Sequence, residues 1–250
     1  MVLRTTKPIP KPQRRWVDVT LAGARFQNAD LTGARFNGVI VADVEIDGLL
    51  LGLKVNGVDV VPLVQAELDR RHPELPQIRS DDPDELREGW ATIRRTWAQT
   101  MARADALPAE QVRVEVADEW SFADTLRHLI FVTDAWISRP ILGDPQPYWP
   151  GGLGATDMPP WFTAAAQLQD ATPSYADIVA ARAQRVSTLT EVIESLTGDE
   201  LARRCTKNRA PGYPADTRRF TVQQCIHTTL SEEWAHHSFA VRDLERLSQG

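Results

Sequence analysis

A hydrophobic residue recurs at every fifth position from residue 16 to residue 51, and this period constrains the fold more than any other feature of the chain. The positions are Trp16, Leu21, Phe26, Leu31, Phe36, Val41, Ile46 and Leu51. Small or β-branched residues stand two positions before nearly all of them. A period of five matches neither the 3.6 residues per turn of an α-helix nor the two-residue alternation of a β-strand. Repetition at a fixed short period is instead typical of a solenoid.

These repeats resemble a known family. Residues 24–38 read ARFQN-ADLTG-ARFNG, which resembles the pentapeptide-repeat family and its A(D/N)LxX motif. The resemblance implies a right-handed, four-sided β-helix whose Leu and Phe centres and small residues point inward. Four repeats make one coil in that family, so residues 16–51 imply about two coils. Because stacking supplies the core of a repeat fold, so short a stack is expected to dock on the rest of the protein, as a packing or interaction module.

Residues 53–83 connect the repeats to the remainder of the chain. Asn56-Gly57 between valines indicates a short hairpin, and Pro62 opens a helix that ends before His72-Pro73. A polar, proline-containing linker comes next. The predicted organisation is a basic, proline-rich arm, a pentapeptide-repeat segment, a connecting helix with its linker, and a helical domain, at residues 1–15, 16–60, 61–82 and 83–250.

The helical domain contains four long patterns with apolar residues at three- and four-residue steps. They lie at about residues 83–107, 121–139, 175–196 and 221–250. Such spacing predicts amphipathic helices, with Ser121 and Ser174 as the N-caps of the second and third. Two long connections separate the helices, so a four-helix bundle is expected. The predicted fold class is mainly α with a small β part.

The last helical pattern carries two ionisable residues on its apolar face. Apolar residues at 226, 230, 240 and 244 mark one ridge, on which Glu233 and His237 lie one turn apart. Burying an unpaired ion costs several kcal/mol, so buried charged side chains are normally paired or bound to a metal. A carboxylate and an imidazole at positions i and i+4 suit two ligands of one Zn²⁺ or similar ion. The alternative is that they pair with each other, or with an arginine, in a half-buried core.

Glu232 and His236 have the same spacing and lie one residue earlier. They share a face with Thr229 and Asp243, which the pattern assigns to the solvated side of the helix. They are therefore expected beside the metal rather than as its ligands. Spacing alone does not decide between the two pairs.

A third ligand is predicted in the second helix. His128 lies in WSFADTLRHLIFVTDAW beside an apolar stripe, where a single histidine is more often a core residue than a ligand. Together with the EEWAHH segment at 232–237, it resembles the DinB/YfiT-like superfamily of metal-binding four-helix bundles, over about residues 83–247. The commonest form uses three histidines, whereas here Glu233 stands in place of the middle one. This variant is similar to the branch that contains mycothiol-dependent maleylpyruvate isomerase, a zinc protein.

The resemblance implies a metal centre. Its protein ligands would be His128, Glu233 and His237, and the ion would be Zn²⁺ first, with Ni²⁺ or Fe²⁺ as alternatives. Three protein ligands and an open position are typical of catalytic zinc sites, where the ion lowers the pKa of a bound water or thiol. The resemblance also implies a low-molecular-weight thiol as cosubstrate. No catalytic side chain is predicted beyond the metal-bound water or thiol.

Further residues are expected around the ion or in the substrate pocket. A long loop rich in Gly, Pro and aromatic residues follows the second helix, and loops of this length with apolar side chains to pack are often lids. The residues expected in the second shell or pocket are His227, Glu232 and His236, with Tyr148, Trp149 and Trp161 from this loop.

Composition narrows the function classes. The net charge of −6 argues against nucleic-acid binding, because proteins that bind nucleic acid normally have a basic face. No stretch approaches the ~20 apolar residues that span a bilayer, and the N-terminal region has no apolar segment typical of a signal peptide. Two cysteines exclude a disulfide framework. A cytoplasmic protein that takes a small-molecule substrate is expected, with homodimerisation implied by the DinB resemblance.

Three functions are left as hypotheses. The first is a metal-dependent, thiol-dependent S-transferase or isomerase acting on a small electrophile. The second is a metal-dependent hydrolase. The third is a catalytically silent scaffold that uses the pentapeptide coils as a binding surface, and it is favoured by the lack of any further acid–base signature.

Overall fold

The computed structural model divides the chain into two compact units, residues 1–49 and 50–250. The structure describes residues 15–26, 29–48, 50–108, 110–117, 119–154 and 173–248. The first unit carries the five-residue repeats, and the second carries the helices. Each unit is described by itself.

The first unit repeats one turn at an interval of ten residues. In the turns at 21–24 and 31–34, the leucine carbonyl accepts a 2.9 Å hydrogen bond from the alanine amide three positions later. The third position of each turn is a glycine in the left-handed region, Gly23 with φ 76° and Gly33 with φ 77°. A type II turn needs φ > 0 at this position, which glycine adopts without steric cost. The two turns therefore lie two five-residue repeats apart and share one backbone geometry.

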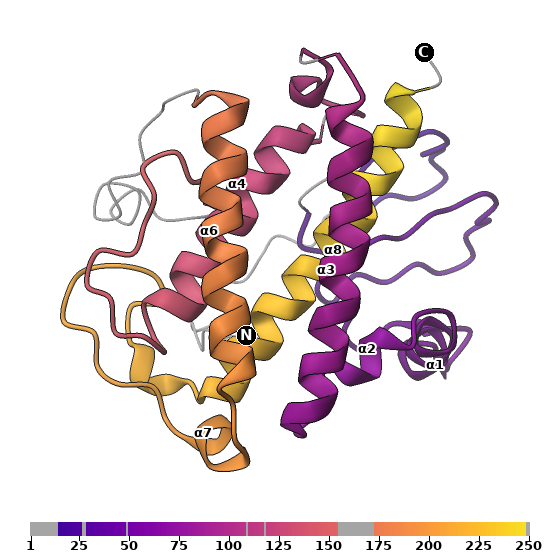
Figure 1. The fold of residues 1–250 in the computed structure, drawn as a ribbon. Coiled ribbons are helices and arrows are strands. Elements are labelled where there is room, and N and C mark those ends of the chain that lie inside the picture. Colours follow the sequence, from indigo (N-terminus) through magenta and orange to yellow (C-terminus); the bar gives the residue numbers. More distant parts are fainter. Residues whose placement is uncertain are drawn as a thin grey trace. The chain divides into compact units, whose positions relative to one another are not determined.

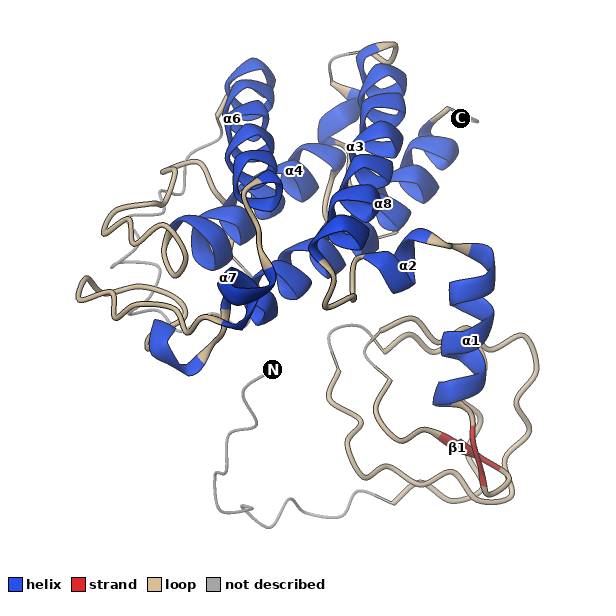
Figure 2. Cartoon of the chain, turned by 60° about the horizontal axis from the view of Figure 1, so that its bottom comes forward, coloured by secondary structure: helices blue, strands red, loops and turns tan. Residues whose placement is uncertain are grey.

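The hydrophobic centres of the repeats remain accessible within the described part of this unit. Leu21 is 51% exposed and Phe36 is 64% exposed. Residues 15–26 and 29–48 contain no helix or strand, and Figure 2 draws them as loop. The inward-facing centres expected from the repeats are thus not seen there, and the two-coil β-helix stays a prediction.

The second unit opens with the predicted hairpin. Strand β1 (Lys54–Val55) pairs antiparallel with β2 (Val58–Asp59). Asn56 and Gly57 connect them with φ 50° and 84°. Positive φ at both central residues is the type I′ geometry that matches the twist of paired strands, and Asn-Gly is its preferred sequence.

Helices make up most of the second unit. Among the residues that the structure describes, its α-helices are α1 (Val61–Arg71), α2 (Glu74–Gln77), α3 (Pro83–Asp105), α4 (Phe122–Thr133), α6 (Tyr175–Glu194), α7 (Gly198–Ala202) and α8 (Val222–Leu247). Single turns are η1 (Gln111–Arg113), the π-helical η2 (Asp134–Ser138) and η3 (Thr217–Arg219). The side chains of Ser121 and Ser174 accept hydrogen bonds from backbone amides of the first turns of α4 and α6, which confirms both predicted N-caps.

The four long helices form a bundle. Helix α4 packs against α6 and α8, and α3 packs against the same two helices, so the four close a ring (Figure 1). Its core holds large apolar side chains such as Trp90, Leu126 and Leu189, each 1% exposed or less. The mainly helical class and the four-helix arrangement agree with the sequence prediction.

The two long connections of the bundle are fastened to each other. The Tyr148 hydroxyl donates to the carbonyl of Tyr213 at 2.9 Å and accepts from the Tyr213 amide at 2.8 Å. Gly212 leaves the space for this contact, because a Cβ there would lie 2.6 Å from the Tyr148 hydroxyl oxygen. Both connections are therefore held at one end of the bundle over their described parts.

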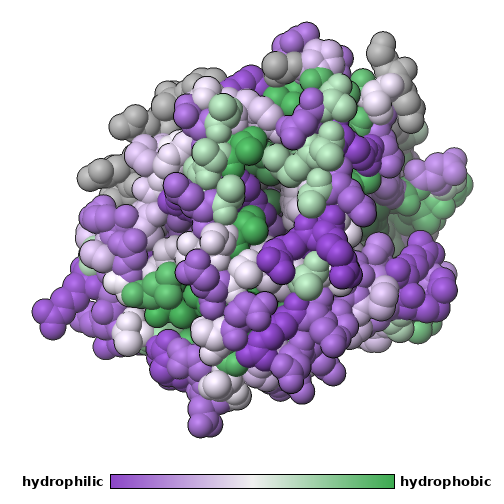
Figure 3. Space-filling model, in the orientation of Figure 1, coloured by the Kyte–Doolittle hydropathy of each residue, from purple (hydrophilic) through white to green (hydrophobic). Residues whose placement is uncertain are grey.

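One face of the molecule can be judged by its hydropathy. The face of the molecule in Figure 3 is largely hydrophilic, with smaller apolar areas between the charged residues. Among the described residues, no helix combines the length and hydropathy needed to cross a bilayer.

Candidate metal centre

Helix α8 lies inside the bundle and has two buried faces. A capping box at Thr221 and Gln224 starts it, and the helix then packs against both α3 and α4. The face predicted to be solvated is partly buried: Thr229 is fully buried and Asp243 is 5% exposed, and Glu232 on the same face contacts His128 of α4. A single apolar ridge therefore does not describe this helix.

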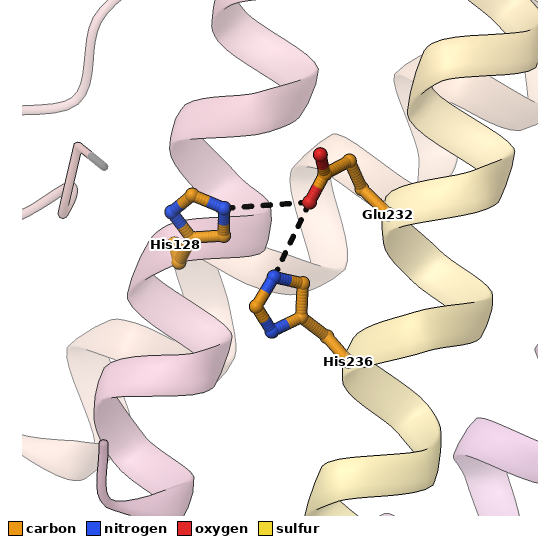
Figure 4. Close-up of side chains that lie close together, drawn as sticks. All are labelled: His128, Glu232 and His236. Atoms are coloured by element: carbon orange, nitrogen blue, oxygen red, sulfur yellow. Dashed lines mark ion pairs between the residues drawn. The ribbon is translucent and has the colours of Figure 1, made fainter. Parts of the chain in front are cut away.

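One of these faces brings two residues of α8 to a histidine of α4. The side chains of His128, Glu232 and His236 point toward one another in Figure 4. A Glu232 carboxylate oxygen lies 3.6 Å from Nε2 of His128 and 3.2 Å from Nε2 of His236. One potential ligand atom from each residue lies within 4.8 Å of the other two. Three donors from two helices thus converge on one point.

The other ring nitrogen of His128 is already engaged. Nδ1 lies 3.1 Å from the carbonyl oxygen of Leu153, which can only accept a hydrogen bond. The contact holds the ring with Nε2 facing Glu232, and a metal ion bound at Nε2 would leave the ring proton on Nδ1, where this carbonyl accepts it. A hydrogen bond of this kind, from the second ring nitrogen to a backbone carbonyl, commonly orients metal-binding histidines.

The carboxylate of Glu232 is held in its ionised form. Partial burial acts to raise its pKa, but hydrogen bonding to His128 and His236 outweighs burial and lowers the pKa from 4.5 to about 2. The side chain keeps 39% of its surface exposed. The cluster therefore presents an anionic oxygen that solvent can reach.

Aromatic side chains enclose the two histidines. The Trp120 ring lies 4.8 Å from the ring of His128, and it stacks on His236 with ring planes 14° apart at 6.0 Å. Phe131 and Phe239 flank the same two imidazoles at 6.2 and 5.7 Å. Sequence reasoning missed Trp120, although it directly precedes the N-cap of α4, because the position before a helix carries no periodic signal.

Glu233 lies on a different face of α8 from the one that carries the cluster. Its carboxylate is fully buried and forms an ion pair with Arg182 of α6. Burial raises the pKa of Glu233, and the attraction of Arg182 opposes that shift. Glu233 is therefore not placed as a metal ligand. It pairs with an arginine in the core, which was the alternative to metal binding.

His237 also points away from the cluster. Its Nε2 lies 2.9 Å from the hydroxyl of Thr100, and its ring meets Trp97 edge to face at 5.1 Å. Burial lowers the pKa of His237. Glu233 and His237 differ from the predicted ligand role because of the helices that they face. On this side of α8, α3 and α6 present Thr100, Trp97 and Arg182, whereas α4 presents His128 on the other side.

The remaining predicted residues lie at several places. His227 is away from the cluster, with Nε2 2.9 Å from the carbonyl oxygen of Ser80. Tyr148 contacts Tyr213, and the Trp149 amide donates to the buried carboxylate of Asp134 at 2.9 Å. Trp161, and with it the middle of the predicted lid, lies outside the described residues.

The donor set of His128, Glu232 and His236 fits a divalent metal ion. Zinc–ligand bonds of about 2.0–2.2 Å in a tetrahedron place neighbouring ligand atoms roughly 3.3–3.6 Å apart. The two separations from Glu232, 3.2 and 3.6 Å, are close to that value. Imidazole nitrogen and carboxylate oxygen suit zinc and the neighbouring transition metals.

Comparison with protein families identifies the helical unit. Residues 92–240 match the family model of the DinB superfamily. The chain belongs to the DinB superfamily. Members of this superfamily often bind divalent metals. Residues 15–42 match the model of pentapeptide repeats (8 copies), so both family resemblances predicted from the sequence are confirmed.

Comparisons with curated proteins and with solved structures give no match for this DinB-superfamily chain.

Proposed function

We propose that this protein is a metal-dependent enzyme whose divalent ion is held by Nε2 of His128, a carboxylate oxygen of Glu232 and Nε2 of His236. The observation that carries the proposal is the convergence of these three donors from α4 and α8, with all ligand atoms within 4.8 Å of one another. The residues of the cluster are the His, Glu-x3-His pattern found by sequence, with the pair shifted by one position.

The side chains around the cluster have distinct tasks. The Leu153 carbonyl orients His128, and Trp120 covers both imidazoles and limits the access of water. Glu232 is the one ligand with substantial solvent exposure, so substrate approaches from its side. The ion supplies Lewis acidity, which lowers the pKa of a coordinated water or thiol.

Thiol-dependent transfer or isomerisation on a small electrophile is the reaction we propose, with Zn²⁺ as the ion. The support is the resemblance of the His, Glu-x3-His pattern to the thiol-dependent branch. In isomerisation, the sulfur of a thiolate adds to one carbon of a C=C bond that is conjugated to a carbonyl, and the π electron pair moves to the other carbon and into the carbonyl as an enolate. Rotation about the resulting single bond and loss of the same thiolate regenerate the double bond, so the thiol is not consumed.

Metal content tests the site directly, and α8 supplies its own control. Untagged wild-type protein should contain about one equivalent of metal, the stoichiometry of one three-ligand site. His236→Gln should lose it, whereas His237→Gln, the same substitution one residue later, should keep it. Wild-type protein that is folded, metal-free, and still metal-free after incubation with Zn²⁺ would refute the metal-dependent proposal.

Cobalt substitution separates the thiol reaction from hydrolysis. If a low-molecular-weight thiol binds the ion, adding it to the Co²⁺ protein should produce a thiolate-to-cobalt charge-transfer band. A Co²⁺ protein without such a band would contradict the thiol reaction and leave a metal-dependent hydrolase as the enzymatic alternative.

A scaffold function is the second candidate, and the exposed repeat centres of the first unit favour it. Trp16, Phe26 and Phe36 are each at least 60% exposed, and apolar surface of this kind often marks a site of protein interaction. In that case replacing the three with serine would abolish partner binding without changing metal content.

A further inference from the structure

The two cysteines of the chain lie against each other although 20 residues separate them in the sequence. Their sulfur atoms are 3.7 Å apart. Cys205 is 3% exposed and Cys225 is fully buried. Neither residue belongs to the candidate metal centre, so a role for this pair is independent of the proposed function.

The backbone at the two ends of the connection between α7 and α8 holds the pair together. These ends run antiparallel to each other. The Cys205 amide donates to the carbonyl of Phe220 at 3.0 Å, and the Val222 amide donates to the carbonyl of Arg203 at 2.9 Å. Helix α8 begins at Val222, and Cys225 lies in its first turn. Both sulfurs are therefore attached to backbone that is hydrogen-bonded on each side of the connection.

The separation of the sulfurs suits a reversible disulfide. A disulfide bond is about 2.05 Å long, so the two atoms would have to approach each other by roughly 1.7 Å. Rotation about the Cα–Cβ bond of a cysteine moves its sulfur over distances of this order. In the reduced protein the contact is a hydrogen bond in which one thiol donates to the other. The pair is thus accommodated as two thiols and is close enough to be joined.

The two thiols differ in reactivity. The hydrogen bond with Cys225 lowers the pKa of Cys205, and the positive charge of Arg203 acts in the same direction, against the effect of burial. The same hydrogen bond, together with burial, raises the pKa of Cys225. Because the thiolate is the nucleophile, Cys205 is the cysteine that reacts first. It also lies between two exposed residues, Arg204 and Thr206, so a small oxidant reaches it when the connection opens locally.

We propose that Cys205 and Cys225 are a redox pair that hydrogen peroxide converts to an intramolecular disulfide. The thiolate sulfur of Cys205 attacks one oxygen of the peroxide and the O–O bond breaks, which leaves a sulfenic acid on Cys205 and releases hydroxide. The sulfur of Cys225 then attacks the sulfur of Cys205. The S–S bond forms, the S–O bond breaks, and the thiol proton of Cys225 leaves with the departing hydroxide as water. In total the two thiols lose two electrons, and one peroxide becomes two waters.

The disulfide fastens the connection to the start of α8. This connection also carries Tyr213, whose backbone holds the Tyr148 hydroxyl of the other long connection. A cross-link between residues 20 positions apart restricts the unfolded chain and thereby stabilises the folded one. The melting temperature of the oxidised protein should therefore exceed that of the reduced protein by roughly 5–10 °C.

Counting free thiols tests whether the bond forms. The full-length protein is reduced, freed of reductant, treated with hydrogen peroxide, quenched with catalase, and labelled with N-ethylmaleimide in denaturant. Intact mass then gives the number of maleimide labels, which oxidation of methionine does not change. Untreated protein should carry two labels, treated protein none, and treated protein two again after incubation with dithiothreitol. A non-reducing gel should show the oxidised chain as a monomer.

Two serine variants test the order of the steps and serve as controls for each other. With dimedone present during oxidation, Cys225→Ser should carry a sulfenic-acid adduct on Cys205, whereas Cys205→Ser should stay unmodified. Neither variant should show the rise in melting temperature on treatment with peroxide. If a variant does not fold, the thiol count of the wild type still decides whether the disulfide forms.

Three outcomes would overturn the proposal: a folded wild type that keeps both maleimide-reactive thiols after treatment with peroxide, a loss of thiols that dithiothreitol does not restore, or a disulfide that joins two chains. A dimedone adduct on Cys225 in place of Cys205 would contradict the roles assigned to the two residues.

Discussion

Helix α8 carries the same motif twice, Glu232-x3-His236 and Glu233-x3-His237, offset by a single residue. The offset turns the two pairs toward different neighbours. The first pair meets His128 of α4, with the Glu232 side chain 39% exposed, whereas the second pair meets Arg182 and Thr100, with Glu233 fully buried. A spacing suited to metal binding is therefore not sufficient for a metal site, because the facing helix decides what the motif does.

The two glutamates show this difference in their protonation. The pKa of Glu232 falls to about 2, because hydrogen bonds to two histidines outweigh burial. The pKa of Glu233 rises, because complete burial outweighs its pairing with Arg182. Two adjacent glutamates thus differ in role: Glu232 presents a negative charge that can bind a metal ion, and Glu233 lies buried in the core beside Arg182.

The largest difference between the two pairs should appear in stability. Glu233→Ala leaves the guanidinium of Arg182 buried without its partner, which typically costs about 3–5 kcal/mol of unfolding free energy. Glu232→Ala, one residue away, should cost less, because 39% of the Glu232 side chain is exposed and water can take its place beside the two histidines. Urea unfolding in EDTA measures both values.

A double variant checks the cause of that loss. Arg182→Met combined with Glu233→Leu removes both charges and fills the space with apolar atoms, so most of the lost stability should return. A double variant as unstable as Glu233→Ala would show that the ion pair is not the reason for the effect.

Metal affinity should show the reverse order. Glu232→Gln removes the anionic ligand, so Zn²⁺ affinity should fall by more than the roughly 10–100-fold that changes around a ligand usually cause. Glu233→Gln keeps the shape of a side chain that does not face the ion, and its affinity should stay within about 10-fold of wild type if the protein folds. Competition with a chromophoric chelator gives both constants. Equal losses in the two variants would remove the distinction between the pairs.

Much of the fold could be predicted because its signals are local. The Asn-Gly hairpin, the N-caps at Ser121 and Ser174 and the four helical periods all depend on residues a few positions apart, and all appear in the structure. The predicted second helix differs in one detail: it ends as α-helix at Thr133 and continues as the π-helical η2. The β-helix of the repeat unit and its docking stay predictions.

The site could be predicted only in part, because the missing information is tertiary. The ridge through residue 233 is buried, as expected, but α8 also buries its other face against α4, where Thr229 is fully inaccessible. Nothing in the hydrophobic period distinguishes a helix with one buried face from a helix with two. The choice between Glu232 and Glu233 needed the position of His128 across the interface, which no spacing within α8 contains.

Fluorescence should also distinguish the two faces, with a smaller effect. Trp120 stacks on His236 and contacts His128, whereas Trp97 contacts His237 and has Arg182 over its ring. Binding of Co²⁺ should quench mainly Trp120, so Trp120→Phe should remove most of the metal-dependent signal and Trp97→Phe should preserve it. A quenching signal lost only in Trp97→Phe would place the ion on the other face. Affinity itself should change no more than about 10-fold in Trp120→Phe, because no donor atom is lost.

The smallest expected effect is a pair of opposite pH dependences in the metal-free protein. Glu232 has a folded-state pKa of about 2, below its ordinary value of 4.5. Its contribution to stability is therefore complete above about pH 4.5 and is lost as the pH falls toward 2. Glu233 has a raised pKa in the folded state, so its contribution is complete below about pH 4.5 and is lost as the pH rises through its folded-state pKa.

Glutamine variants isolate these two contributions. The free energy of unfolding that wild type has in excess of Glu232→Gln should shrink as the pH falls below about 4.5. Wild type should lose stability relative to Glu233→Gln as the pH rises above about 4.5. Solvent exposure of Glu232 keeps the first effect small. Urea unfolding in EDTA, at several pH values over which all three proteins stay folded, provides the test. Slopes of the same sign would mean that the two glutamates share one environment, and the contrast between the two faces of α8 would then be wrong.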